Sequence, residues 1–311
     1  MKPKDVTRKH AYLIIAHNNV EFLKRELQLL DDSRNDIYLH LDCKMPNVTE
    51  TELKGVLKQA SLFFVDREDV KWGGYSIVRV TMSLLKAAYK RGPYSFYHLI
   101  SGADLPLHSQ DYIHDFFDAH EGFEFVAYDR PVMLEQVKKR VSRFYLFQDL
   151  YGRKHKKFPF VMFYVFERIF LKLQDLCKVD RFAKENIIVQ KGPEWFSITN
   201  VLVKEILSKE EWIKKHFQFT RCADEVFVQT VLRNSDRKDY VYMNGLRDAK
   251  CSPCMRYIDW KRGKPYTWRE EDYDELVASP YLFARKFDPN VDAVIIDRII
   301  AHIEEEECKG M

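Results

Sequence analysis

The chain has 311 residues and a mass of 37.2 kDa, enough for one large domain or two small ones with a substantial apolar core. Hydrophobic residues make up 46% of the sequence and charged residues 31%, a balance typical of folded globular proteins and not of disordered chains. The 50 Lys and Arg nearly cancel the 47 Asp and Glu, which leaves a net charge of +3. Bulk charge therefore gives no indication of nucleic-acid binding.

The first 130 residues alternate short apolar runs with amphipathic stretches. Runs rich in β-branched and aromatic residues predict buried strands, and helical spacing of apolar residues predicts the helices between them. The predicted strands cover 11–16, 37–41, 61–65, 95–100 and 123–128, and the predicted helices cover 21–30, 76–89 and 111–120. This alternation predicts βαβ units, and so an α/β fold with a mostly parallel central sheet flanked by helices.

Ligands of such sheets bind at the carboxyl ends of the strands. The residues that follow the predicted strands, His17, Asp42 and the segment 101–107, are therefore candidate site residues.

In the second half of the chain the pattern predicts further short elements. They are strands at 187–189, 195–198 and 255–260, and helices at 201–207, at 224–232 and near Glu270. The chain has no internal repeat or convincing linker, so we expect one composite domain whose second half is built onto the first.

The segment 138–178 differs in character, because clustered Lys and Arg residues precede an aromatic run at 158–166. That run is far too short to span a bilayer. A basic stretch beside an aromatic helix fits peripheral contact with an anionic membrane surface, or a cover for the substrate cleft. The alternative is a solvated loop followed by a core helix.

The cysteines and the N-terminus bear on location. Six cysteines spread over the chain favour reduced thiols, and therefore a cytoplasmic protein, over a disulfide framework. The basic stretch 1–10 precedes an apolar run at 11–16 that is too short for export, so we expect neither a cleaved leader nor an anchor.

Two short motifs have metal-ligand spacing. Cys251 and Cys254 have the spacing of half a zinc site, but no second pair of ligands follows them. Asp272 and Asp274 match an Asp-x-Asp signature but lie in an acidic helix start. We therefore expect no metal at either place.

The candidate chemistry rests on isolated polar residues, since the sequence has no P-loop, no glycine-rich dinucleotide motif, no GxSxG and no HExxH. Glu225 and Asp224 begin an apolar helix. Glu225 fits a general base. Asp224 fits a carboxylate of the site and a helix cap equally well. Arg285 and Lys286 suit an anion such as diphosphate, although adjacent cations also pair with local acids. Asp104 fits an acceptor for sugar hydroxyls or an Asx turn.

Seven blocks lie in a fixed order along most of the chain. They are Ala11-Tyr-Leu-Ile-Ile-Ala-His17, Tyr38-Leu-His-Leu-Asp42, Val70-Lys-Trp-Gly-Gly-Tyr-Ser-Ile-Val78, Tyr97-His-Leu-Ile-Ser-Gly-Ala-Asp-Leu-Pro-Leu107, Gly192-Pro-Glu-Trp-Phe-Ser-Ile198, Asp224-Glu225 and Phe283-Ala-Arg-Lys-Phe-Asp288. Together they resemble the glycosyltransferase family of core-2/I-branching β-1,6-N-acetylglucosaminyltransferases and peptide O-xylosyltransferases.

The resemblance implies a GT-A-type nucleotide-sugar transferase fold in a single domain, 1–311. Residues 1–130 would form the nucleotide-sugar-binding half, and residues 131–311 the acceptor-binding and catalytic half with a C-terminal diphosphate-binding segment. The family's reaction inverts the anomeric centre, takes a UDP-sugar as donor, and uses no cofactor and no divalent metal.

The resemblance also implies roles for individual residues. Glu225 matches the catalytic base, Lys286 with Arg285 beside it resembles the diphosphate clamp, and Asp104 matches the aspartate that contacts the donor sugar. Glu194 and Trp195 fall in the block that lines the donor and acceptor sugars.

The residues that resemble the uridine side are His17, Asp42, Trp72 and Ser76. An upstream basic residue that contacts phosphate in the family matches Arg256, Lys261 or Arg262, of which we favour Arg262.

The expected function is transfer of a sugar, N-acetylglucosamine into a β-1,6 branch first, from its UDP-sugar to a saccharide acceptor. The animal enzymes have a luminal stem and disulfides, which we do not expect here. In this the chain resembles a bacterial relative that is cytoplasmic or peripheral at the inner face of the plasma membrane. The expected acceptor is then a bacterial polysaccharide or a lipid-linked saccharide, and we expect no nucleic-acid partner. The alternatives are UDP-xylose or another UDP-sugar as donor, or a non-catalytic glycan- or membrane-binding module.

Overall fold

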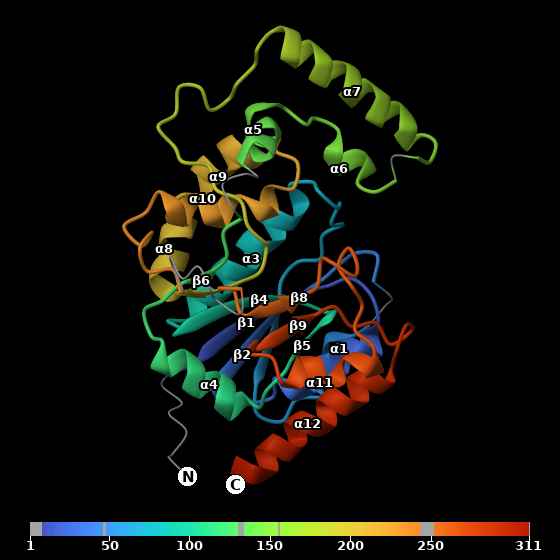
Figure 1. Cartoon of the computed structure of the whole chain (residues 1–311), viewed down its shortest axis with the longest axis vertical. Helices are drawn as coiled ribbons and strands as arrows, with labels where there is room; N and C mark the ends of the chain where they lie inside the picture. Colours follow the sequence, from blue (N-terminus) through green and yellow to red (C-terminus); the bar gives the residue numbers. More distant parts are fainter. Residues whose placement is uncertain (1–7, 46–47, 130–133, 155, 243–251, 311) are drawn as a thin grey trace.

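The computed structural model describes residues 8–45, 48–129, 134–154, 156–242 and 252–310 (Figure 1). Cys251 and the first seven residues, on which the zinc-spacing and leader predictions depend, lie outside these ranges.

The main sheet has six strands in the order β3-β2-β1-β4-β7-β6. Their bounds are β1 His10–Ala16, β2 Asn35–Leu41, β3 Ser61–Phe64, β4 Phe96–Ser101, β6 Phe125–Val126 and β7 Phe196–Thr199. β1 is parallel to both β2 and β4, and β2 is parallel to β3. β7 is antiparallel to β4, and β6 is antiparallel to β7. Every residue of β1, β2 and β4 is buried, which explains why these strands read as continuous apolar runs.

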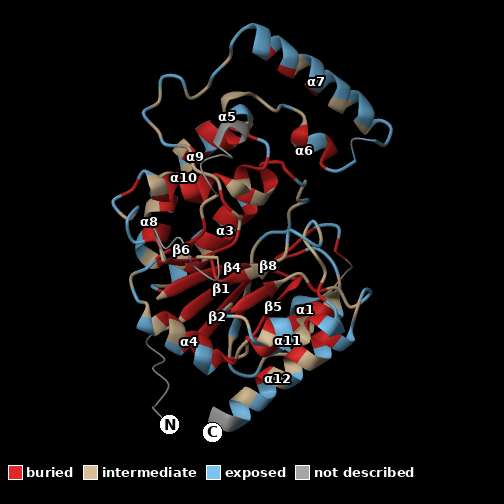
Figure 2. Ribbon diagram, viewed as in Figure 1, coloured by how far each residue is buried: buried red, intermediate tan, exposed pale blue. Residues whose placement is uncertain are grey.

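Helices cover both faces of this sheet (Figures 1 and 2). They are α1 Val20–Leu29, α2 Glu50–Lys54, α3 Ser76–Arg91, α4 Gln110–Ala119, α8 Asn200–Ser208, α9 Glu210–Phe217 and α10 Phe227–Arg233. Helices α11 Tyr273–Val277 and α12 Val294–Gly310 pack instead with Phe22 and Leu29 of α1. Successive β1 side chains point to opposite faces, so Leu13 packs in a cluster with α3 and α8 residues while Ile14 packs with α1 and α4 residues. The predicted α/β architecture, with a mostly parallel central sheet flanked by helices, is confirmed.

A second, three-stranded sheet joins distant parts of the chain. It consists of β5 Asp104–Pro106, β9 Phe283–Arg285 and β8 Arg256–Ile258 in the order β5-β9-β8. The sequence pattern does not predict β5 or β9, because three-residue strands carry too little periodicity. Their antiparallel register places Asp104 opposite Arg285.

Two predicted elements of the second half were wrong. The segment 187–189 is not a strand, because its backbone bonds to side chains instead: Ile188 N donates to Asn234 Oδ1 at 2.9 Å. The helix predicted from position 224 begins at Phe227, and Ala223–Glu225 form a separate 3₁₀ turn. Val226, with φ near −132°, lies outside helical geometry and separates the two.

Three helices, α5 Leu134–Ser142, α6 Gln148–Tyr151 and α7 Phe160–Leu176, stand at one end of the molecule, opposite α12 (Figure 1). We call residues 134–178 the arm. The alternative of a core helix after the basic stretch is wrong, because most of α7 is exposed (Figure 2). No helix in the described ranges combines the length and hydropathy that crossing a bilayer requires.

Candidate active site

The second sheet builds an ion pair between a buried carboxylate and a half-buried guanidinium at the carboxyl end of β4. Arg285 Nη1 donates to Asp104 Oδ1 at 2.8 Å, and the other Asp104 oxygen accepts from the Ser101 backbone N–H at 2.8 Å. The guanidinium stacks over the Trp195 ring at 4.3 Å from its centroid. Asp104 and Trp195 are buried, so the pair holds one fixed geometry. The structure thus joins three residues that the sequence predicted separately.

Lys286 differs from its neighbour in having no such partner. Across the described ranges, no carboxylate forms an ion pair with its ammonium group. Partial desolvation lowers the pKa of His17, and the positive charges of Arg285 and Lys286 lower it further. These two cations therefore act on the residue that follows β1, at the carboxyl edge of the parallel strands, where a diphosphate would find an unneutralised positive charge.

Glu225 lies in the 3₁₀ turn before α10 and is paired through one oxygen only. Its Oε2 accepts from Arg140 Nη1 at 2.7 Å and lies 3.5 Å from Lys191 Nζ, which also pairs with Asp129 at 2.6 Å. No described side chain hydrogen-bonds to Oε1. The residue lines a cavity of about 290 Å³ together with Asp129, Lys191, Arg256, Trp260 and Tyr281, among others. The two cations hold the carboxylate and leave Oε1 available for a proton.

Two further carboxyl groups surround this turn. Burial and the charge of Asp224 raise the pKa of Glu194 well above its usual range. Burial, followed by the charge of Glu225, raises the pKa of Asp224 to about 7. Each of the two has a buried oxygen without a hydrogen-bond partner. Since neighbouring carboxylates cannot all ionise at low cost, protons are held here at neutral pH.

The segment before Glu194 is fixed by α10 and by close backbone packing. Thr230 Oγ1 accepts from Gln190 N at 3.1 Å, and Gly192 N donates to the Glu225 carbonyl at 3.0 Å. A Cβ on Gly192 would lie 1.9 Å from the Ala127 carbonyl oxygen, so only glycine fits there. This packing places Lys191 against Glu225.

The predicted uridine-side residues form a connected loop structure after β2. Asp42 is buried, and its two carboxylate oxygens accept hydrogen bonds from the backbone N–H groups of Lys44 and Val70, at 2.8 and 3.1 Å. Ser76 Oγ accepts from Lys71 N at 2.8 Å. Asp42 and Ser76 therefore shape the loop, whereas the ring of Trp72 is 45% exposed and has the guanidinium groups of Arg153 and Arg221 at 4.8 and 5.8 Å from its centroid.

The three candidates for an upstream phosphate contact lie in different surroundings. Arg262 pairs with three carboxylates, those of Asp259, Asp272 and Glu275, so its charge is already neutralised. Arg256 is buried and donates to the Phe196 carbonyl and to Ser197 Oγ, both at 2.7 Å. Lys261 is exposed. Arg262 stacks over Tyr266 and Trp268, whose backbones bond to the backbone of Lys286, and its predicted phosphate contact stays a prediction.

One group of metal-ligand side chains occurs within the described residues, formed by His108, His302 and Glu306. Glu306 already accepts from the Ser109 backbone N–H at 2.8 Å and lies 3.1 Å from His108 Nδ1. These bonds tie α12 to the start of α4, beyond the far end of β5 from Asp104. Hydrogen bonding explains the group without an ion, and a metal-free reaction stays a prediction.

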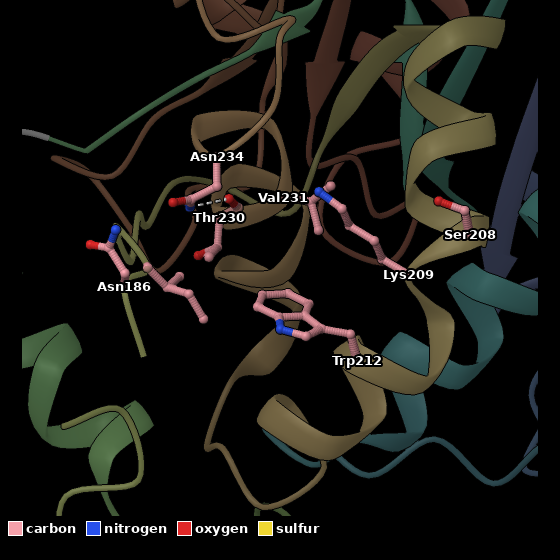
Figure 3. A pocket seen from close by; sticks show the side chains of 8 residues that line it. Asn186, Ser208, Lys209, Trp212, Thr230, Val231 and Asn234 are labelled. Atoms are coloured by element: carbon pink, nitrogen blue, oxygen red, sulfur yellow. Dashed lines mark hydrogen bonds between the residues drawn. The ribbon is translucent and has the colours of Figure 1, made fainter. Parts of the chain in front are cut away.

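A second cavity, of about 310 Å³, lies among α8, α9 and α10 (Figure 3). Trp212, Thr230 and Asn234 line it. Asn234 Nδ2 donates to the Thr230 and Ile188 carbonyls at 2.7 and 2.9 Å, and Thr230 bonds to Gln190. The polar groups of this cavity hold the 187–190 segment in place, and we assign it no ligand.

Sequence reasoning missed the partners of Glu225. Arg140 comes from the arm, 85 positions away, and no local pattern links the two. Lys191 directly precedes the Gly192 block, and that adjacency was the only signal that could have found it.

Comparison with known proteins agrees with the resemblance. The family model described as "Branch: Core-2/I-Branching enzyme" matches residues 10–278. The chain belongs to this family. Xylosyltransferase 1 of Rattus norvegicus is 23% identical over 314 residues, covering 94% of this chain and 35% of that protein. Xylosyltransferase 1 of Homo sapiens is 24% identical over 310 residues, covering 93% of this chain and 30% of that protein.

The family member described here thus spans about a third of the length of the curated relatives it matches. Among solved structures, mouse xyloside xylosyltransferase 1 in its apo form matches with a TM-score of 0.34 and 10% identity, over 88% of this chain and 96% of that one. S. aureus TarS matches with a TM-score of 0.27 and 14% identity, over 36% of this chain and 20% of that one.

Proposed function

We propose that this chain is a GT-A-type glycosyltransferase that inverts the anomeric centre, needs no divalent metal, and moves a sugar from a UDP-sugar to a saccharide acceptor. The observation that carries the proposal is that a cation for the leaving group and a carboxylate for the acceptor proton come from two different segments. Lys286 offers an unpaired cation beside the Asp104–Arg285 pair, and Glu225 offers an unpaired oxygen on a cavity. Family membership supports the same reaction class.

In the proposed reaction, Glu225 Oε1 takes the proton of an acceptor hydroxyl while that oxygen bonds to the anomeric carbon of the donor. The bond from that carbon to the UDP oxygen breaks, and its electron pair leaves with the diphosphate. Lys286 stabilises the negative charge that develops there. Arg285 is held by Asp104 and by Trp195, so it positions the clamp and the aromatic face.

The identity of the donor forms the finer part of the proposal. N-acetylglucosamine in a β-1,6 linkage is the first candidate, and xylose is the second because the curated relatives are named xylosyltransferases. We propose a bacterial polysaccharide or glycolipid precursor as acceptor, and a cytoplasmic location at the inner membrane face.

The test is a panel of UDP-sugars assayed for hydrolysis and transfer, with and without EDTA. We expect turnover with one donor, unchanged by the chelator. Glu225→Gln should lower kcat by about 10²–10⁴-fold and leave UDP binding unchanged, because it removes the proton acceptor alone. Glu211→Gln, an exposed carboxylate on α9, is the matched control.

Lys286→Ala should weaken both UDP binding and turnover, with Lys204→Ala, an exposed lysine on α8, as its control. Wild-type turnover in Glu225→Gln would contradict the assigned base. Activity that EDTA abolishes and Mn²⁺ restores would contradict the metal-free mechanism. UDP-sugar binding without any turnover would identify a binding module instead.

A further inference from the structure

Helix α7 buries one apolar side chain, Leu171, and exposes seven others to solvent. Those that are 37 to 80% exposed are Val161, Met162, Val165, Phe166, Ile169, Leu173 and Leu176, and Phe158 just before the helix is also exposed. At 100° per residue these helix positions fall within an arc of about 140°. Lys172 also falls within this arc, and Figure 2 shows α7 mostly exposed along the outer side of the arm. We call the seven apolar residues, with Phe158, the α7 stripe.

The opposite side of the same helix buries polar groups. Glu167 Oε2 accepts from Phe147 N at 2.7 Å, and Glu167 Oε1 accepts from the Tyr151 hydroxyl. Gln174 accepts from Phe144 N at 2.8 Å and donates to Phe144 O at 2.9 Å. Rolling α7 to bury the stripe would break these four bonds, so the outward position of the apolar side chains is fixed.

The charge around the stripe is mainly positive, and Asp175, the exposed acidic residue of α7, pairs with Arg143. Between positions 153 and 172 the basic residues are Arg153, Lys154, Lys156, Lys157, Arg168 and Lys172. The only acidic residue in that span is Glu167, whose carboxylate is buried in the arm. An apolar stripe edged by cations is complementary to a surface that is apolar inside and anionic at its boundary.

We propose that α7 docks on an anionic lipid bilayer, with its axis in the membrane plane and the α7 stripe in the headgroup and acyl boundary. Its 17 residues span about 26 Å, and the buried Glu167 side faces the protein, so the helix lies on the bilayer. A second copy of the chain fits the stripe less well, because pairing two stripes would bring both sets of cations together.

The arm also reaches the candidate active site. Arg140 on α5 pairs with Glu225, and Gln148 on α6 donates to the Trp72 carbonyl at 2.9 Å. Docking α7 would therefore hold the Glu225 side of the molecule close to the bilayer, where a lipid-linked saccharide presents its sugar. The acceptor class rests on the proposed function. The docking does not, because the vesicle experiment measures bound protein and not turnover.

The experiment is cosedimentation of the full chain with vesicles of phosphatidylglycerol and phosphatidylcholine, and with pure phosphatidylcholine vesicles, at low and high salt. We expect binding to the anionic vesicles only, reduced by salt. The stripe variant Phe166→Ser/Ile169→Ser/Leu173→Ser should bind at least about 100-fold more weakly. Replacing Lys154, Lys156 and Lys157 by Gln should weaken binding by about 100-fold, at about fivefold for each charge.

A control variant, Val201→Ser/Tyr240→Ser/Val294→Ser, removes three side chains of similar exposure that lie outside the arm and should bind as the wild type does. Equal recovery with neutral vesicles, or unchanged binding by the stripe variant, would overturn the proposal. A dimeric wild type that the stripe variant converts to a monomer, without vesicle binding by either, would assign the stripe to a second copy. Turnover on a water-soluble acceptor, measured in parallel, reports the proposed function separately.

Discussion

The α/β body and helix α7 of the arm differ in how far they cover their apolar side chains. In the body, β1 is buried along its whole length, and the buried carboxylate of Asp104 pairs with the half-buried Arg285. In the arm, α7 buries Leu171 together with the polar Glu167 and Gln174, and it exposes seven apolar side chains. The usual link between hydropathy and burial therefore holds in the body and weakens along α7, whose exposed apolar face needs a second surface to cover it.

The largest expected effect lies in the body, at Arg256. Its guanidinium donates to the carbonyls of Phe196 and Leu99 and to Ser197 Oγ, between β7, β4 and β8. Arg256→Met keeps the volume and leaves these buried acceptors unpaired, so it should lower the free energy of unfolding by about 3–5 kcal/mol. Urea denaturation measures it, with the exposed Lys261→Met as control. A loss below about 1 kcal/mol would mean that the hydrogen bonds of Arg256 contribute little to the stability of the body.

A second expected effect depends on pH. The unfolded Asp224 ionises near pH 4, whereas its pKa in the folded protein is raised to about 7 by burial. Between these values the folded state holds the extra proton, so wild-type stability falls as pH rises from 4 to 7. Asp224→Asn removes this loss and should raise the Tm by several degrees more at pH 8 than at pH 5. Thermal denaturation at both pH values, with the exposed Asp236→Asn alongside, measures the difference; an equal gain at both would contradict the burial.

The smallest effects belong to the arm. Glu167→Ala leaves the Phe147 N–H and the Tyr151 hydroxyl without their partner, and should destabilise α7 locally by about 1–3 kcal/mol. Amide hydrogen exchange should then rise within 144–176 while the strands of the main sheet keep their protection. Ile169→Ser, on the outward side, should change stability by no more than about 0.5 kcal/mol. A larger loss of stability for Ile169→Ser than for Glu167→Ala would show that the arm, like the body, is stabilised mainly by its apolar side chains.

The sequence predicted the main sheet well, because its long strands contain runs of apolar residues and its helices carry regular apolar spacing. It missed β5 and β9, since a three-residue strand is defined by its partner and not by its own residues. It also misjudged 187–189, where Asn234 and Thr230 replace a strand partner.

For the candidate site, the family blocks found the side chains and the structure supplied their partners. Asp104, Arg285 and Trp195 come from three separate blocks, and only the structure shows that they meet. The pairing of Glu225 with Arg140 joins two segments whose nearness no local pattern records. Arg262 shows the reverse case, since its three carboxylates follow only from how 259–275 folds.

The β5–β9 pairing has a consequence for how the chain acquires its chemistry. Strands β1 to β4 are complete once position 101 has left the ribosome, but the partner of Asp104 is translated 181 positions later. A nascent polypeptide can thus assemble four strands of the main sheet before Arg285 is available to pair with Asp104. The residues proposed to hold a diphosphate are added to a fold whose parallel strands already exist.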